Sequence, residues 1–67
     1  MVVEIAILKA RVGAADQLRD GLRAARPVIA RAEGYRGSVF YQGVEHPESF
    51  VLQVEWDTVE AHMLGFR

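Results

Sequence analysis

Hydrophobic and polar side chains alternate along the segment from Phe50 to Asp57. One series consists of Phe50, Leu52, Val54 and Trp56, and the other of Val51, Gln53, Glu55 and Asp57. A period of two is typical of a β-strand with one apolar face. The segment is therefore predicted to be a strand that carries the indole of Trp56 to one end of a sheet.

A helix is predicted directly after this strand. Asp57 and Thr58 are both common N-cap residues. If Asp57 is the cap, Glu60 stands at the third helical position, as in a capping box, and if Thr58 is the cap, the box is lost. The positions that share one face of this helix are Val59, His62, Met63 and Phe66. We expect the helix to bring the imidazole of His62 close to Trp56.

The N-terminal segment also alternates, with Val3, Ile5 and Ile7 in one series and Glu4, Ala6 and Leu8 in the other. Its β-branched content favours a strand over Val2–Ala10, ended by Gly13. Both series are fairly apolar, which predicts that this strand is covered on both faces.

A long amphipathic helix is predicted next. Its apolar positions are Leu18, Leu22, Ala25, Ile29 and Ala32. Arg19, Arg23 and Arg26 lie on the opposite side, and we interpret them as a solvated helix face rather than an anion-binding patch. Pro27 falls inside the pattern and removes a backbone donor, so a kink or break is expected there. Gly34 is a suitable C′ residue.

A second strand is predicted from Tyr35 to Gln42, and residues 43–49 form a hairpin connection because His46-Pro47 disfavours a continuing ladder. The order β-α-β-β-α, with a helical crossover followed by a hairpin, predicts an α+β fold with an antiparallel sheet and both helices on one face. This is the ferredoxin-like plan without its last strand. Because that strand would pair with the first, its absence leaves Val2–Ala10 as an open apolar edge. We therefore expect the natural polypeptide to continue for roughly 25–35 residues.

Composition limits the classes of function. The 67 residues make one domain, 51% of them are hydrophobic, and there is no cysteine for a disulfide or a thiolate metal site. Association with another chain is the remaining way to stabilise so short a chain. The net charge of −1 gives no footprint for nucleic acid or an anionic membrane. No apolar run approaches a membrane span and no basic signal-peptide start is present, so a soluble cytoplasmic protein is expected.

The segment from Phe50 to Trp56, followed by Thr58-Val-Glu-Ala-His62, resembles the antibiotic biosynthesis monooxygenase (ABM) domain. The strand–Gly13–helix opening and the Glu33-Gly34 helix end resemble it too. The resemblance covers residues 1–67, as the first two-thirds of such a domain. It implies a dimeric α/β barrel in which two ferredoxin-like sheets pack face to face, with a cavity between each sheet and its own helices. It also implies oxidation of phenolic polyketides, anthrones or quinols by O2 without metal or flavin. A related branch degrades haem.

Two positions depart from the family pattern. Some catalytic members have an asparagine four residues before the tryptophan, where this chain has Leu52. The haem degraders need an asparagine on the first strand, and the matching position here is Ala6. Haem degradation is therefore disfavoured.

The candidate catalytic residues are Trp56 and His62. The indole N–H of Trp56 can donate to a developing oxyanion, but Trp56 can equally be a core aromatic. His62 can act as a general base on a phenol, or it can be a hydrogen-bonded structural histidine. Leu22, Leu52 and Met63 are expected to form a dry wall for the substrate.

No cofactor or metal is expected. Glu45, His46 and Glu48 are three loop residues without a fourth ligand, and His46 is predicted to be solvent-exposed. The leading function is a cofactor-independent monooxygenase that oxidises an aromatic or quinol-like molecule with O2. The alternative is a non-catalytic dimeric barrel of a stress-response type that binds a small apolar ligand. In both cases a homodimer is predicted, because the sheet face without helices carries Val3, Ile5, Ile7, Val51, Gln53 and Glu55.

Overall fold

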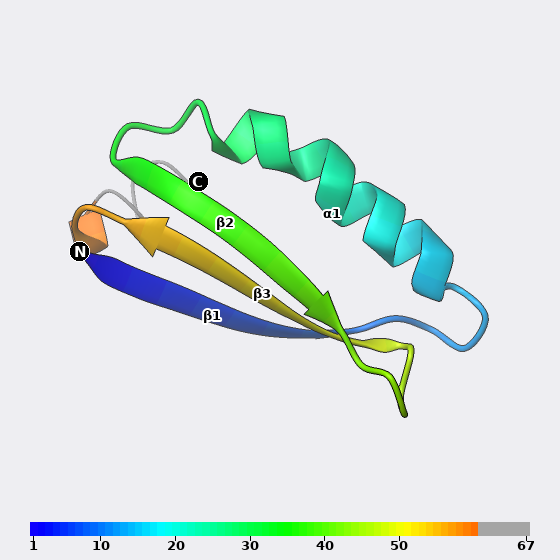
Figure 1. Cartoon of the computed structure of the whole chain (residues 1–67). Coiled ribbons are helices and arrows are strands. Elements are labelled where there is room, and N and C mark those ends of the chain that lie inside the picture. Colours follow the sequence, from blue (N-terminus) through cyan, green and yellow to red (C-terminus); the bar gives the residue numbers. More distant parts are fainter. Residues whose placement is uncertain (61–67) are drawn as a thin grey trace.

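The computed structural model describes residues 1–60 of the chain. Its elements are β1 (Val2–Lys9), α1 (Ala15–Ile29), β2 (Tyr35–Gln42) and β3 (Ser49–Trp56), as Figure 1 shows. A helical segment begins at Val59, and the rest of the second predicted helix lies outside the described residues. The predicted α+β, ferredoxin-like plan is confirmed for this part of the chain.

The three strands form one antiparallel sheet in the order β1-β3-β2. β3 pairs with β1 from Val2↔Trp56 to Lys9↔Ser49 and with β2 on its other side. β1 and β2 are therefore parallel to each other but separated by β3. As the sequence predicted, β1 is an edge strand of the described sheet.

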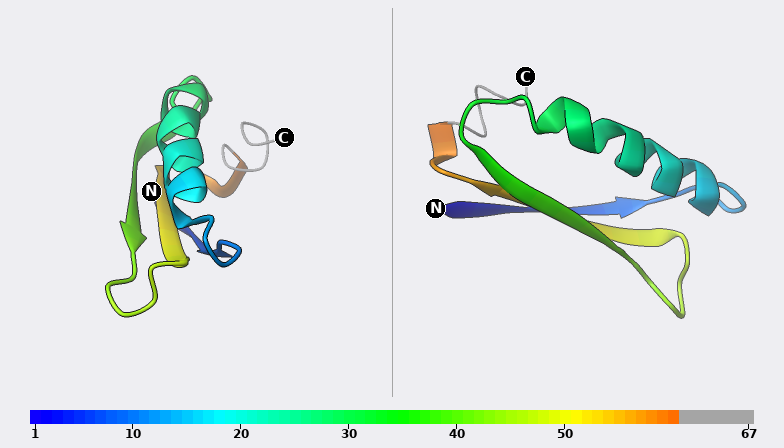
Figure 2. Two further views of the ribbon diagram at one scale, coloured as in Figure 1. Left: turned by 90° about the vertical axis from the view of Figure 1, so that its right-hand side faces the viewer. Right: turned by 45° about the horizontal axis from the view of Figure 1, so that its top comes forward.

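The helix α1 packs along one face of the sheet, on the side of β2 (Figure 1, Figure 2). The even-numbered residues of β1 point to this covered face and are half-buried, whereas the odd-numbered residues are exposed. Ile5 is 55% exposed and Ile7 is 82% exposed. The expectation that β1 is covered on both faces is therefore wrong for a single chain, because no described element lies over the second face.

The core lies under the central strand. The fully buried side chains among the described residues are Phe50, Val54 and Trp56, all from β3 and all on the face toward α1. β3 is the only described strand with a neighbour on each side, so its side chains lose solvent access from both edges. The ring of Phe40 on β2 packs against Phe50, with the two centroids 6.3 Å apart.

Several predicted boundaries shift. β1 ends at Lys9, four residues before Gly13. Pro27 lies in the last turn of α1, and the helix ends two residues later at Ile29. The kink or break predicted at Pro27 is therefore a helix end. Gly34 is not the C′ residue of α1, because Ala30 caps the helix in the αR conformation. Gly34 instead adopts a φ of 86° in the turn that leads into β2, a conformation that glycine reaches without strain.

Candidate functional site

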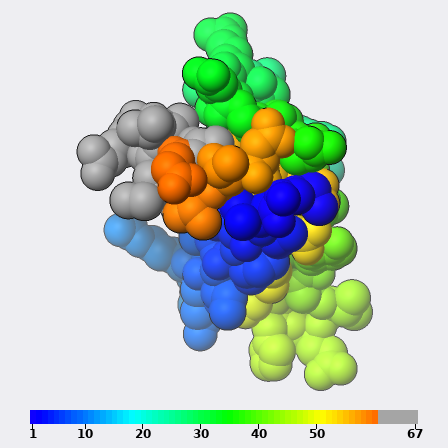
Figure 3. Space-filling model, turned by 90° about the vertical axis from the view of Figure 1, so that its left-hand side faces the viewer, coloured from blue at the N-terminus to red at the C-terminus, as the bar shows by residue number. Residues whose placement is uncertain are grey.

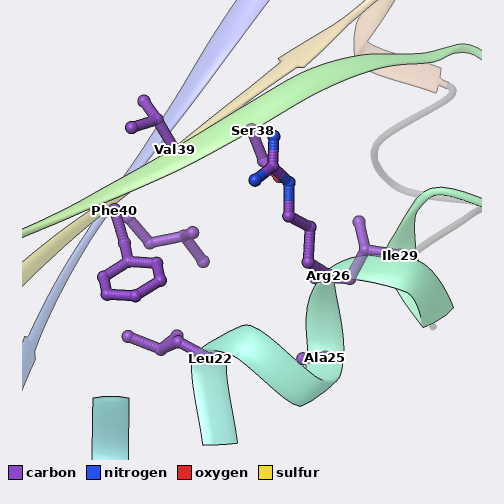
Figure 4. A pocket seen from close by; sticks show the side chains of 8 residues that line it. Leu22, Ala25, Arg26, Ile29, Ser38, Val39 and Phe40 are labelled. Carbon is purple, nitrogen blue, oxygen red and sulfur yellow. The ribbon is translucent and has the colours of Figure 1, made fainter. Parts of the chain in front are cut away.

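A pocket of about 230 Å³ lies between α1 and the sheet (Figure 4). It is lined by Leu22, Ala25, Arg26 and Ile29 from α1, Ser38, Val39 and Phe40 from β2, and Leu52 from β3. Figure 4 shows the side chains of Leu22 and Phe40 pointing toward each other, while Val39 points to the opposite side of β2. The wall is mainly aliphatic and aromatic, as expected where the apolar stripe of an amphipathic helix faces a sheet.

One end of this pocket is polar. Arg26 extends from α1 toward β2 and lines the pocket together with Ser38 (Figure 4). The Oγ atom of Ser38 is 2.7 Å from the hydroxyl of Tyr35, and either hydroxyl can donate. Arginine offers five donors in a planar fork and no acceptor. This end of the pocket is therefore suited to an oxygen-bearing group, above all an anionic one.

Arg26 is not on the helix side opposite the apolar stripe, where the sequence pattern placed it. A helix turns about 100° per residue, so Arg26 falls at the edge of the stripe formed by Leu22 and Ile29. Arg23 lies farther around the helix and does not line the pocket. Among residues 1–60, Arg26 has no ion-pair partner, whereas Arg19 pairs with a carboxylate at 3.0 Å.

Trp56 lies at the end of the sheet and is fully buried. Its Nε1 donates a hydrogen bond to Oε1 of Glu4 at 3.2 Å. Its ring meets the ring of Tyr35 edge-on, with centroids 6.0 Å apart and an interplanar angle of 83°. This edge-on arrangement is favourable because the positive edge of one ring meets the negative face of the other. Within residues 1–60, Trp56 is thus held by Glu4 from β1 and by Tyr35 from β2.

Trp56 lines a second pocket, also of about 230 Å³, together with Val2, Val3, Glu4 and Val59. At this end of the molecule the start of β1 lies beside the residues that follow β3 (Figure 3). Leu22 and Leu52, which the sequence suggested as part of a substrate wall, therefore line one pocket, while Trp56 lines the other.

A β-bulge in β2 places Tyr35 against Trp56. Tyr35 is paired with Trp56, but Gly37 is paired with the adjacent Glu55, so Arg36 is the extra residue. In a regular ladder Arg36 would pair with Trp56, and Tyr35 would project from the opposite face of the sheet, because side chains alternate along a strand. The sequence pattern carried no signal for the bulge.

Arg36, at this bulge, pairs with Asp57 at 2.7 Å. The hydrogen bond and the charge of Asp57 raise the pKa of Arg36. Because the carboxylate of Asp57 binds Arg36 and the helical segment begins at Val59, Thr58 is the residue that precedes the second helix. Of the two caps that the sequence left open, the structure favours Thr58, so the capping box is lost.

Glu4 is the site residue that the sequence reasoning missed. It belongs to an alternating series in the sequence, and it lies opposite Val54 on the covered face of the sheet. A carboxylate at a covered position needs a partner, and the indole of Trp56 is one. The sequence signal for this pair was an acidic residue at a strand position that faces the apolar series of β3.

Of the remaining candidates, His62 and Met63 are outside the described residues. His46 is exposed in the β2–β3 loop, where its carbonyl accepts a hydrogen bond from the backbone of Ser49. Within residues 1–60, no three His, Cys, Asp or Glu side chains gather as a metal site would require. No helix in the described part is long and apolar enough to cross a membrane.

Comparison with known proteins adds three findings. The family profile for antibiotic biosynthesis monooxygenases matches residues 1–66. The uncharacterised protein YczJ of Bacillus subtilis is 36% identical over 67 residues, which are all of this chain and 70% of that protein. A Bordetella bronchiseptica protein, provisionally described as an antibiotic biosynthesis monooxygenase, has a crystal structure that matches with a TM-score of 0.88 and 35% identity, over 97% of this chain and 66% of that one.

A protein of Nitrosomonas europaea with the same provisional description has the same fold. Its TM-score is 0.84 at 17% identity, over 94% of this chain and 61% of that one. The chain thus spans less than two-thirds of the length of both structures.

Proposed function

Because the chain belongs to the antibiotic biosynthesis monooxygenase family, we propose that it is a monooxygenase that oxidises an aromatic or quinol-like molecule with O2. The observation that carries this proposal is the apolar pocket between α1 and the sheet, with Leu22, Phe40 and Leu52 in its wall. An apolar, partly enclosed space suits both O2 and a flat ring system. Its volume of about 230 Å³ favours a small substrate of few rings.

The reaction needs no bound cofactor if the substrate supplies the electrons. In an anthrone, the methylene carbon loses two hydrogen atoms and gains one oxygen atom as a ketone. The other oxygen atom leaves as water with those two hydrogen atoms. The carbon thus gives up all the electrons that reduce O2, once a base has removed a proton to make it electron-rich.

His62 is the proposed base. Its imidazole would take a proton from the phenol or the activated C–H of the substrate. Leu22, Leu52 and Met63 are proposed to form the dry wall that positions the ring. His62→Ala should lower turnover roughly 10²–10⁴-fold while the protein stays folded.

A second copy of the chain is proposed to cover the free face of the sheet. That face presents Val3, Ile5, Ile7, Val39, Tyr41 and Val51, and several of these side chains are about half exposed or more. A contiguous apolar surface of this kind is typical of an interface. A two-fold axis would pack the same face of both copies together and give a sheet-on-sheet dimer.

The test is turnover of anthrone and hydroquinone by the purified protein in air and under nitrogen. The proposal predicts product only in air, with one atom of labelled ¹⁸O2 in each product molecule. Folded protein that forms no O2-dependent product from any substrate of either class would refute it.

The second candidate is ligand binding without catalysis. Two observations favour it. Arg26 is the only titratable side chain among the described residues that line the α1 pocket, and a guanidinium does not serve as a base. The indole of Trp56 donates to Glu4 rather than pointing into that pocket. Saturable binding of an aromatic ligand without oxygen consumption would establish this alternative.

A further inference from the structure

Arg26 combines three properties that the proposed oxidation does not use. It lines the α1 pocket although the residue is exposed, it has no ion-pair partner among residues 1–60, and it shares the pocket wall with Ser38, whose hydroxyl is hydrogen-bonded to that of Tyr35. The other pocket-lining side chains are apolar except for Ser38. The charge is therefore concentrated at one end of an otherwise apolar space.

A charged group beside an apolar pocket selects ligands by charge. The planar fork of Arg26 matches the two oxygens of a carboxylate or the single oxygen of an aryloxide. Ser38 and Tyr35 share one hydrogen bond, which leaves the hydroxyl pair with a further proton to donate. The apolar wall of Leu22, Phe40 and Leu52 would bury the rings of the same ligand.

We propose that the α1 pocket binds aromatic acids, meaning flat ring systems with an ionised oxygen group, and that Arg26 is the residue that selects them. This inference rests on the proposed function, because it assumes that the α1 pocket is the ligand site. It adds the charge of the ligand, its orientation with the oxyanion toward β2, and the residue that sets specificity.

The experiment compares two ligands of the same shape by isothermal titration calorimetry. 2-Naphthoate is the anionic probe, and 2-naphthamide is its neutral counterpart. The wild-type protein should bind 2-naphthoate at least about tenfold more tightly, because one ionic hydrogen-bonded contact is worth that much or more. Added salt should weaken the binding of 2-naphthoate and leave that of 2-naphthamide unchanged.

Three variants test the role of Arg26. Arg26→Gln should remove the preference for 2-naphthoate without changing the affinity for 2-naphthamide. Arg26→Lys keeps the charge but loses the fork, so it should retain part of the preference. Arg23→Gln is the matched control, because Arg23 is exposed on the same helix, as Arg26 is, but does not line the pocket. It should behave as the wild type.

Two results would overturn the inference while the proposed function stands. One is equal affinity of the wild type for both probes. The other is an equal loss of 2-naphthoate binding in Arg26→Gln and Arg23→Gln, which would indicate a general effect of net charge. Failure of the folded wild type to bind either probe would overturn the inference together with the pocket on which the proposed function depends. O2-dependent turnover, measured separately, distinguishes these cases.

Discussion

Trp56 is both the most buried large side chain of the described residues and one of the two catalytic candidates from the sequence. Trp56→Phe separates these roles. The substitution keeps an aromatic ring against Tyr35 but removes the indole N–H that donates to Glu4. It also removes one of the two fused rings from a fully buried position, where the surrounding strands cannot close the space completely.

The expected loss of stability has two parts. The hydrogen bond to Glu4 is long at 3.2 Å and its acceptor is half-buried, so we assign it about 1 kcal/mol, below the usual value for a charged acceptor. Replacing a buried tryptophan with alanine costs roughly 3–5 kcal/mol, and phenylalanine restores about half of that packing, which leaves roughly 1.5–2.5 kcal/mol. The sum of about 2.5–3.5 kcal/mol corresponds to a fall in Tm of roughly 10–30 °C for a domain of this size.

The assay is a double-mutant cycle with Glu4→Ala, followed by thermal and urea unfolding at one protein concentration. Trp56→Phe and Glu4→Ala should be coupled by about 0.5–1 kcal/mol, because each removes the same hydrogen bond. A coupling near zero, together with a loss below about 0.5 kcal/mol for Trp56→Phe, would refute the packing account. Unchanged stability with lost turnover would instead place the indole in the reaction.

Three further predictions concern the rest of the molecule. Gly43→Ala should lower the free energy of unfolding in urea by about 1–3 kcal/mol, because an added Cβ would lie 2.6 Å from the carbonyl oxygen of His46. Gly21→Ala, with open space around its Cβ, should instead raise it by roughly 0.5–1 kcal/mol. If both changes have the same sign, the hairpin geometry is wrong. Ile5→Glu should convert the proposed dimer to a monomer in sedimentation at low micromolar concentration, and a dimer that persists would exclude this face as the interface. Arg36→Gln should lower Tm slightly, and by the same amount from about pH 5 to about pH 9. The stability linked to the raised pKa of Arg36 is lost only when the pH rises through that pKa, which lies above this range. A loss of Tm confined to one end of the range would contradict the raised pKa.

The period-two pattern predicted β3 to within one residue because burial acts on alternate side chains of a strand. Three of the four residues in its apolar series, Phe50, Val54 and Trp56, are fully buried. The fourth, Leu52, is only half-buried because it lines the α1 pocket. The alternation along a strand thus predicts the face to which a side chain points, but not whether that face is packed or forms a pocket at a given position.

Other features depend on contacts between segments distant in sequence. Glu4 and Trp56 are 52 residues apart and meet only because β1 pairs with β3 from one end. The bulge at Arg36 exists because of the register against β3, which no local pattern in β2 records. Arg26 sits at the border of its helix stripe, where only the position of β2 decides whether it lines a pocket or faces solvent.

The two pockets lie at different positions on one face of the sheet, so the proposed ligand site is separate from the buried indole of Trp56. Leu52 and Trp56 point to the same side of β3 but are four residues apart, a distance of roughly 13 Å along a strand. α1 packs on the side of β2, so the pocket it forms includes Leu52 and not Trp56, while Trp56 meets β1 at the sheet end. A small ring system that binds near Arg26, as proposed, should therefore not contact the indole. This separation requires that Arg26→Gln lose selectivity with stability intact, and that Trp56→Phe lose stability with ligand selectivity intact.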